Sequence, residues 1–156
     1  TQVAGRAGRG EMPGRVIVQS YDPEHYVLQA VKAHDPGSFL ERELAERKAY
    51  GYPPYSYLSL IKITHEDPGE AQARGLRAME SLRQNAQAEN AGDSLLILGP
   101  TYAPIQRIKN KTRMHLLLKC SNRELLHRVL HRFVAYLDNG NLWSSVALDV
   151  DPNNLL

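Results

Sequence analysis

Between residues 57 and 150, apolar residues recur with strand spacing in some stretches and with helical spacing in others. This pattern indicates a succession of strands and helices. The stretch SNRELLHRVLHRFVAYLDNG has the strongest helical signal, because its apolar residues form one stripe and Ser121 and Glu124 have capping-box spacing. The predicted elements are a strand at 57–64, a helix at 67–89, strands at 94–100 and 112–120, a helix at 121–140 and a strand at 145–150. This order predicts an α+β, ferredoxin-like (βαββαβ) domain, with a four-stranded antiparallel sheet and two helices on one face.

The first third of the chain has a less regular pattern. A β-branched run at 16–18 predicts a short strand. Two helices are predicted after it, at 24–33 and at 38–50, with a break at the sequence DPG. Ser38 has the position of an N-cap for the second helix, and Gly51 has the position of its C-terminal stop.

Two consecutive prolines, Pro53 and Pro54, force an extended connection after these helices. We therefore expect a domain boundary, with 1–52 as the end of one unit and 53–156 as the ferredoxin-like domain. Aromatic rings around the boundary could stack on nucleic-acid bases, but holding the boundary against both domains is the favoured interpretation. These aromatic residues are Tyr50, Tyr52, Tyr55 and Tyr57.

Charge is distributed unevenly along a chain of 156 residues whose formal net charge is only +2. Residues 101–132 contain eight Lys or Arg and a single acid, Glu124, whereas 133–156 contain three Asp and no Lys or Arg. Such a local surplus attracts a polyanion even where the whole chain is nearly neutral. A solvated face on a hairpin and a helix explains the same surplus, so charge alone leaves both interpretations open.

The cysteine content and hydropathy restrict the setting. Cys120 is the only cysteine, so this sequence can form no internal disulfide and no multi-cysteine metal site. The sequence contains no apolar run of about 18 residues and no signal sequence. We therefore expect a protein of the reducing cytoplasm that contacts no membrane.

Two pairs of side chains have spacings that occur in metal or catalytic sites. His127 and His131 are four residues apart on the last predicted helix, but without a third ligand a solvated helix face is favoured. Asp149 and Asp151 alternate on the last predicted strand, and we interpret them as capping a turn or pairing with nearby basic residues. No metal site is predicted from either pair.

The opening stretch TQVAGRAGRG fits the pattern Q-x-x-G-R-x-G-R. Arg6 and Arg9 suit phosphate because a guanidinium is planar, permanently charged and bidentate. An arginine placed at a γ-phosphate stabilises the charge that develops during NTP hydrolysis. The pattern therefore indicates part of a nucleotide-phosphate site, although the sequence contains no phosphate-binding loop of the form G-x-x-x-x-G-K-[ST].

This pattern resembles motif VI of superfamily 2 helicases. The longer stretches PGRVIVQSYDPEH, ELAERKAYGYPPYS, GPTYAPIQRIKNKTRMHLLLK and LDVDP resemble the C-terminal part of the replication-restart helicases, the PriA family (primosomal protein N′). The resemblance implies that 1–52 is the end of an α/β, RecA-like helicase lobe and that the chain is a C-terminal fragment. The whole helicase is then an ATP-dependent 3′-to-5′ DNA helicase that recognises stalled or branched forks and starts primosome assembly.

The resemblance also implies roles for individual residues of the opening stretch. Arg6 and Arg9 match the arginine fingers of the helicase ATP site, and Gln2, Gly5 and Gly8 match the nucleotide-binding positions beside them. In the whole helicase, ATP and Mg²⁺ are held mainly by other segments, and Zn²⁺ is held by cysteines that this sequence lacks. We therefore expect the fragment alone to be inactive and to hold no cofactor.

A basic stretch, RIKNKTR, is the main candidate for DNA binding. Its side chains alternate, so they would share one face if the strand continued, and phosphate contacts need only such a positive track. The resemblance implies that this domain binds single-stranded and forked DNA. A solvated hairpin whose lysines discourage edge pairing is the alternative. The candidate DNA-binding residues are Arg107, Lys109, Lys111, Arg113 and Lys119.

The resemblance also implies partner proteins. It implies docking of the acidic tail of single-stranded DNA-binding protein near the start of the last helix, where Arg123 lies, and contacts with other primosome proteins in a bacterial, nucleoid-associated setting. One alternative function is a protein-docking platform for such an acidic peptide, without direct DNA gripping. A ribosomal-type RNA-binding module is a third.

Overall fold

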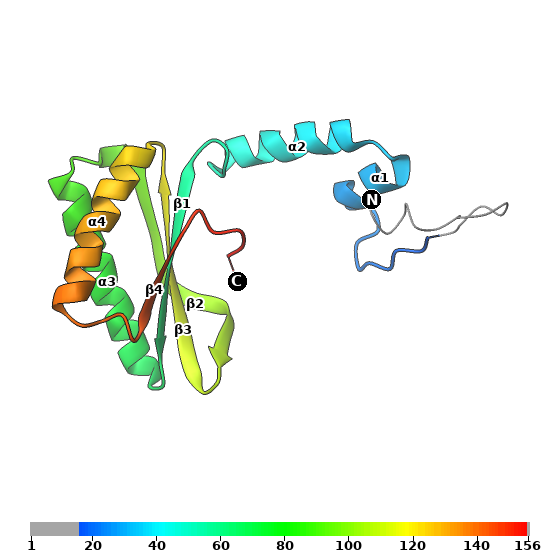
Figure 1. Ribbon diagram of the computed structural model, residues 1–156. Helices are drawn as coiled ribbons and strands as arrows, with labels where there is room; N and C mark the ends of the chain where they lie inside the picture. Colours follow the sequence, from blue (N-terminus) through cyan, green and yellow to red (C-terminus); the bar gives the residue numbers. More distant parts are fainter. Residues whose placement is uncertain (1–15, 156) are drawn as a thin grey trace. The chain divides into compact units, whose positions relative to one another are not determined.

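The computed structural model describes residues 16–155, and contacts divide the chain into two compact units, Thr1–Glu46 and Arg47–Leu156 (Figure 1). The division falls inside a helix and lies N-terminal to the two prolines at which the sequence predicts a boundary. No helix in the described part of the chain is long and apolar enough to cross a membrane. The two units are considered separately.

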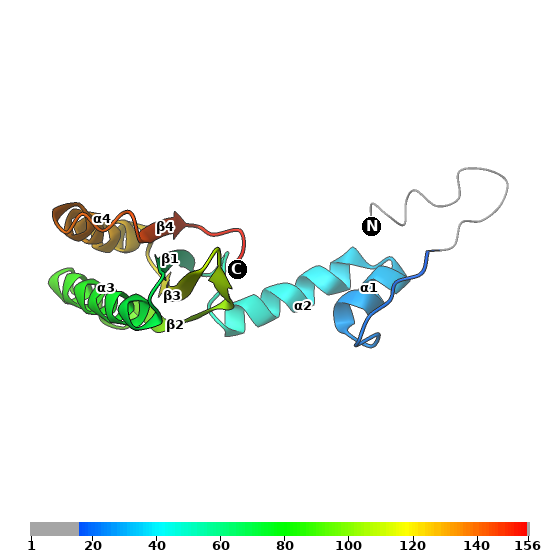
Figure 2. The ribbon, with the colours of Figure 1, turned by 90° about the horizontal axis from the view of Figure 1, so that it is seen from below.

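The second unit contains a four-stranded antiparallel sheet with the strand order β2-β3-β1-β4. Both long helices, α3 and α4, cover one face of this sheet (Figures 1 and 2). The elements are, in order, β1 (Tyr57–His65), α3 (Pro68–Ala88), a 3₁₀ turn (Gly92–Ser94), β2 (Leu95–Ile108), β3 (Lys111–Cys120), α4 (Arg123–Asn139) and β4 (Val146–Val150). The predicted βαββαβ order and the mixed α/β character are therefore confirmed.

The hydrophobic core lies between the helices and the sheet. On the central strands, Ile61 faces the same side as its register partner Leu116, and both are fully buried. Phe133, on the apolar stripe of α4, is also fully buried against them. Burying one such side chain contributes about 1.5–3 kcal/mol, so this layer provides much of the stability of the fold.

The N-cap of α4 lies one residue after the predicted cap, Ser121. The side chain of Asn122 accepts a hydrogen bond from the Leu125 amide at 3.0 Å, so Asn122 is the N-cap. Ser121, the predicted cap, instead donates its amide to the Ser94 carbonyl. Ser121 therefore extends the pairing of β2 and β3, and the next residue takes the capping position.

β2 is longer than the predicted strand at 94–100, because the sequence GP does not end it. Gly99 has a φ of +103°, and a Cβ there would lie 2.6 Å from the His115 carbonyl oxygen, so a glycine is needed. Pro100 is tolerated because β2 is an edge strand. Between Tyr102 and Arg107 a further register shift carries β2 away from β3, on the side away from α3 and α4, before the two strands pair again at Arg107 and Thr112 (Figures 1 and 2).

The first unit contains α1 (Tyr26–Ala33) and most of α2 (Pro36–Ala49). The aromatic rings of Tyr26 and Phe39 stack with centroids 6.2 Å apart, and the Tyr26 hydroxyl donates to Glu43 at 2.6 Å. That hydrogen bond is the main reason why the pKa of Tyr26 is raised. These contacts fold α1 against α2.

Two predictions for the first unit are wrong. Residues 16–18 form no strand, because no described residue pairs with their backbone, and Ile17 is 78% exposed. α2 begins at Pro36 rather than at Ser38, because the Asp35 carboxylate caps it by accepting the amides of Gly37 and Ser38 at 3.1 Å. The motif with Arg6 and Arg9, including the positions Gln2, Gly5 and Gly8, lies outside the described residues.

Candidate nucleic-acid and peptide interface

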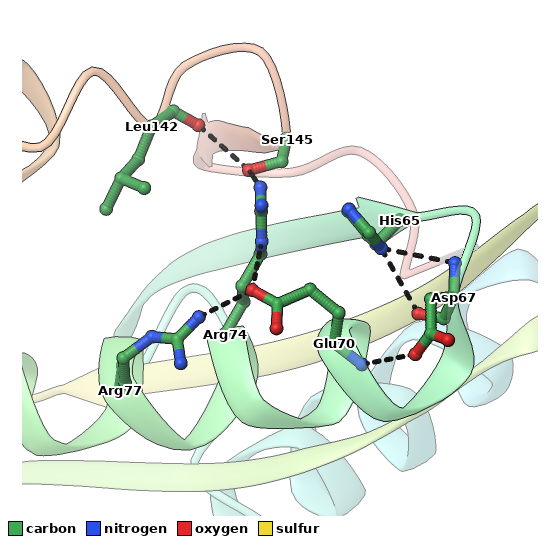
Figure 3. A network of polar contacts seen from close by, with 7 residues as sticks. All are labelled: His65, Asp67, Glu70, Arg74, Arg77, Leu142 and Ser145. Atoms are coloured by element: carbon green, nitrogen blue, oxygen red, sulfur yellow. Dashed lines mark hydrogen bonds and ion pairs between the residues drawn. The ribbon is translucent and has the colours of Figure 1, made fainter.

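Two arginines of α3, Arg74 and Arg77, are paired with one carboxylate. Glu70 accepts from Arg74 Nε at 2.9 Å and from Arg77 Nη2 at 2.8 Å, and Arg74 also donates to the Ser145 hydroxyl at 2.7 Å (Figure 3). Arg74 and then Arg77 hold the pKa of the Glu70 carboxyl below its usual range. The network ties the first turns of α3 to the start of β4, so these charges serve the fold.

Two arginines of α4 are paired in the same way. The Glu89 carboxylate, at the C-terminal end of α3, accepts from Arg132 Nε at 2.6 Å and from Arg128 Nε at 2.8 Å. Arg132 and then Arg128 hold the pKa of Glu89 below its usual range. Each carboxylate oxygen takes one arginine, which joins the C-terminal end of α3 to the middle of α4 and neutralises part of the positive charge of α4.

The hairpin that joins β2 to β3 holds its arginines differently. Arg107 Nη2 donates to the amide oxygen of Asn110 at 2.6 Å, and Arg113 Nη1 donates to the Ile105 carbonyl at 3.2 Å. Both acceptors are uncharged. No described carboxylate forms an ion pair with either arginine, or with the exposed Lys109 or Lys111. The hairpin therefore orients two guanidinium groups without neutralising any of its four charges.

The four charges surround the tip of the hairpin instead of lining one face. β2 and β3 are joined by a tight turn at Lys109 and Asn110, whose φ angles are 48° and 64°, so the strand does not continue as the alternation required. Arg107 pairs with Thr112 and faces the helix side of the sheet, whereas Lys111 lies on the opposite side. The prediction of one shared face is wrong for this reason.

Lys119 lies at the other end of β3, eight residues from Lys111, or about 26 Å along an extended strand. Its ammonium group donates to the Tyr50 carbonyl at 2.9 Å and lies 3.7 Å from the centroid of the Tyr52 ring. Lys119 is thus separate from the hairpin cations and is already engaged by the connection that precedes β1.

An open pocket of about 440 Å³ lies beside this connection. Its walls include Pro53 and Pro54, the first residues of β1, and the segment that follows β4 from Asp151. Arg123, at the start of α4, also lines it and forms no ion pair with any described residue. The pocket thus combines apolar proline rings with one available guanidinium. This combination suits the C-terminal carboxylate of a peptide that ends in an apolar residue.

The comparisons with known proteins agree with the sequence resemblance. A model of the family described as the primosomal protein N C-terminal domain matches residues 48–153. The chain belongs to this family. Replication restart proteins PriA of Bacillus subtilis, Synechocystis sp. and Haemophilus influenzae are 36%, 37% and 32% identical to it over 98%, 99% and 99% of its length. The chain spans about a fifth of the length of these curated relatives.

In this member of the primosomal protein N C-terminal domain family, the structure separates the predicted DNA and partner residues into three places. Arg107, Lys109, Lys111 and Arg113 gather at the hairpin tip, Arg123 lines the pocket, and Lys119 lies apart. The sequence indicated these cations through their local surplus of charge. It missed Asn110, whose role depends on a turn with positive φ, and the pocket walls, which come from distant segments.

The helix-free face of the sheet carries a buried histidine that sequence analysis did not single out. His115 is only 5% exposed, and its Nε2 atom has no hydrogen-bond partner among the described residues. Burial lowers its pKa, and the charges of Arg113 and Lys62 lower it further. Lys62 itself pairs with Asp149 at 2.9 Å, so that carboxylate faces a sheet lysine rather than the hairpin. No three described His, Cys, Asp or Glu side chains gather as metal ligands.

Proposed function

We propose that this chain is part of a replication-restart DNA helicase and that its β2–β3 hairpin binds the phosphate backbone of DNA. The observation that carries the proposal is the set of four cations at the hairpin tip, none of which forms an ion pair with a described carboxylate. A backbone contact needs positive charge on an accessible projection and no reading of bases. The family relationship favours DNA as the polyanion.

The arrangement suits backbone binding in a second respect. Arg107 and Arg113 are already oriented by the Asn110 side chain and the Ile105 carbonyl, so less side-chain freedom is lost on binding. Lys109 and Lys111 are exposed on a tight turn between them. A projection with charge on several sides can follow a groove or a fork junction more readily than a flat face.

The test removes the hairpin charges together. A variant with Arg107, Lys109, Lys111 and Arg113 changed to Ala should bind single-stranded and forked DNA at least about 100-fold more weakly at low salt, because phosphate contacts dominate affinity. The control removes the same number of charges from the helix layer, at the four arginines that carboxylates pair: Arg74, Arg77, Arg128 and Arg132. Unchanged DNA affinity in the hairpin variant contradicts DNA binding by this strip. A clear preference of the wild-type chain for structured RNA over forked DNA supports the RNA-binding alternative instead.

For the whole protein, we propose an ATP-dependent 3′-to-5′ helicase that recognises stalled or branched forks and starts primosome assembly. In this proposal 53–156 is a ferredoxin-like domain, which the strand order β2-β3-β1-β4 supports, and 1–52 is the end of a RecA-like lobe. ATP, Mg²⁺ and Zn²⁺ belong to the whole protein, where Arg6 and Arg9 would stabilise charge on the nucleotide. In the full-length protein, Arg9→Ala should abolish ATPase activity and spare DNA binding. A normal rate of ATP hydrolysis in this variant contradicts the role of Arg9 as an arginine finger.

A second candidate function is peptide docking in the pocket that Arg123 lines. The supporting observation is an available guanidinium beside proline rings in an open pocket. The acidic tail of single-stranded DNA-binding protein is the proposed ligand, alongside other primosome proteins as partners. A synthetic Asp-rich peptide with an apolar, free C-terminus should bind the wild-type chain and lose affinity for Arg123→Ala by about tenfold. The same peptide with an amidated C-terminus serves as the control, and equal binding of both peptides contradicts recognition of the C-terminal carboxylate.

A further inference from the structure

Lys119 makes two contacts with the segment that precedes β1. Its Nζ atom donates to the Tyr50 carbonyl at 2.9 Å and lies 3.7 Å from the Tyr52 ring centroid. Lys119 is also the register partner of Leu58, which begins the buried part of β1. One side chain from the sheet thus holds the chain on both sides of Gly51.

The segment held by Lys119 is otherwise fixed mainly by local contacts. The Ser56 hydroxyl donates to the Gly51 carbonyl at 2.6 Å, and Arg47 Nη1 donates to the Pro53 carbonyl at 3.2 Å. These bonds set the shape of the turn, but each joins residues at most six positions apart. Lys119 contributes contacts from a distant strand, so it has the most influence on where the turn lies over the sheet.

The held segment forms one wall of the pocket with Arg123. Pro53 and Pro54 follow Tyr52 directly and line the pocket, as does Leu58. The Leu58 carbonyl in turn accepts the amide of Asp151 at 3.1 Å, which positions the opposite wall. A shift of the connection would therefore change the width of the pocket while leaving Arg123 in place on α4.

We infer that Lys119 is a positioning residue for this pocket and not one of the DNA contacts. The inference rests on the peptide-docking function proposed for the pocket. To reach a phosphate, Lys119 would have to give up the Tyr50 carbonyl and the Tyr52 ring, whereas the hairpin cations give up no ion pair with a described carboxylate. Its distance from the hairpin tip along β3 also separates it from a track of phosphates that the tip would bind.

The experiment compares three variants of β3 in the whole chain, together with Tyr52→Leu alone and combined with Lys119→Met. Lys119→Met removes the charge and both contacts, and Lys119→Arg keeps a donor and a cation for the ring. Lys111→Met is the matched control, because it removes the same charge from the same strand at the hairpin end. Each variant is measured for amide hydrogen exchange at 50–58 and at Asp151, for affinity to the Asp-rich peptide, and for the salt dependence of DNA affinity.

Lys119→Met should speed exchange at Tyr52 and at Asp151 and weaken peptide binding at least about fivefold, since a cation over an aromatic ring and its hydrogen bond are both lost. Its DNA salt slope should match the wild type, whereas Lys111→Met should reduce the slope and leave exchange unchanged. Lys119→Arg should keep wild-type exchange and peptide affinity. Tyr52→Leu should resemble Lys119→Met, and the two changes together should cost less than their sum.

Two results overturn the inference. One is unchanged exchange and peptide affinity in Lys119→Met. The other is a loss of DNA salt slope equal to that of Lys111→Met. If the wild-type chain binds no acidic peptide, the docking function fails, and faster exchange at Asp151 in Lys119→Met still establishes that Lys119 positions the pocket walls.

Discussion

The arginines of the helix layer and those of the β2–β3 hairpin are the same residue type used in two ways. Four arginines of α3 and α4 are held in pairs by carboxylates, Arg74 and Arg77 by Glu70, and Arg128 and Arg132 by Glu89. In the hairpin, the acceptors are the Asn110 side chain and the Ile105 carbonyl.

Arginines that pair with a carboxylate join one secondary-structure element to another. Arginines with a neutral acceptor keep a charge that is available to bind an anion. A carboxylate partner lowers the net field of an arginine, whereas a neutral acceptor orients the guanidinium and leaves its field intact. A count of Lys and Arg along the sequence cannot make this distinction. We therefore expect changes at the paired helix arginines to affect stability and changes at the hairpin arginines to affect DNA binding.

The largest effect on folding is expected at Arg74, which joins α3 to Ser145 at the start of β4. Arg74→Met should lower the free energy of unfolding by about 1–2 kcal/mol, because the buried Ser145 hydroxyl and the Glu70 carboxylate both lose a charged donor. Arg113→Met, in the hairpin, should change it by less than about 0.5 kcal/mol. Urea titration measures both, and equal destabilisation by the two variants breaks the comparison.

A smaller, pH-dependent effect is expected at Glu89. Arg132 and Arg128 depress its pKa in the folded chain, so the folded state favours the ionised form. The resulting stability is present above the ordinary Glu pKa of about 4.3 and is lost as the pH falls through the depressed folded value. Glu89→Gln should therefore lower the urea midpoint at pH 7, and its difference from the wild type should shrink in acid. A difference that stays constant from neutral to acid pH contradicts the pairing.

A change of a few fold in DNA affinity is expected when the neutral acceptor of Arg107 is removed. Asn110→Gly keeps the turn, because glycine accepts a φ of 64°, and it removes the amide oxygen. DNA binding should weaken about two- to threefold through lost orientation. Asn141→Gly is the matched control, since Asn141 has a φ of 49° in the turn before β4. Fluorescence anisotropy that gives both variants the same affinity excludes orientation by Asn110.

The smallest expected effect is on the pKa of His115. Burial is the main cause of its lowered pKa, and Arg113 is the next. Arg113→Met should therefore raise the His115 pKa and leave it below the ordinary value of about 6.5. Arg132→Met should not change it. An NMR titration of the His115 ring measures both, and an unmoved pKa in Arg113→Met indicates that the charge of Arg113 is compensated.

Most of the second unit could be predicted from periodicity alone. Four of its six long elements, β1, α3, β3 and β4, lie within one residue of the predicted bounds, and α4 lies within two, because each has one buried face. The strand at 94–100 was predicted, but the continuation of β2 to Ile108 could not be, since a proline is tolerated in a strand only at an edge, and edge position is a property of the whole sheet. The strand at 16–18 failed for a related reason, because a β-branched run needs a pairing partner to become a strand.

The candidate site could be predicted only in part. Local charge density located the hairpin cations and the family resemblance indicated Arg123, but the pairing of Glu89 with Arg132 joins positions 43 residues apart, which no local pattern reveals. The same limit applies to Lys119, because its contact with the Tyr50 carbonyl joins positions 69 residues apart. In the sequence alone it is one more basic residue of the predicted strand. Whether a cation is available is therefore a tertiary property.

The salt dependence of DNA affinity distinguishes the available charges of the hairpin from the paired charges of the helix layer. The magnitude of the slope of log affinity against log salt should fall by about one for Lys109→Met and by about one for Lys111→Met. Each variant makes one phosphate contact fewer, so its binding releases fewer counterions. Arg128→Met and Arg132→Met should leave the slope unchanged. A slope that falls equally in the hairpin and helix-layer variants, or in neither, contradicts the division between available and paired charge.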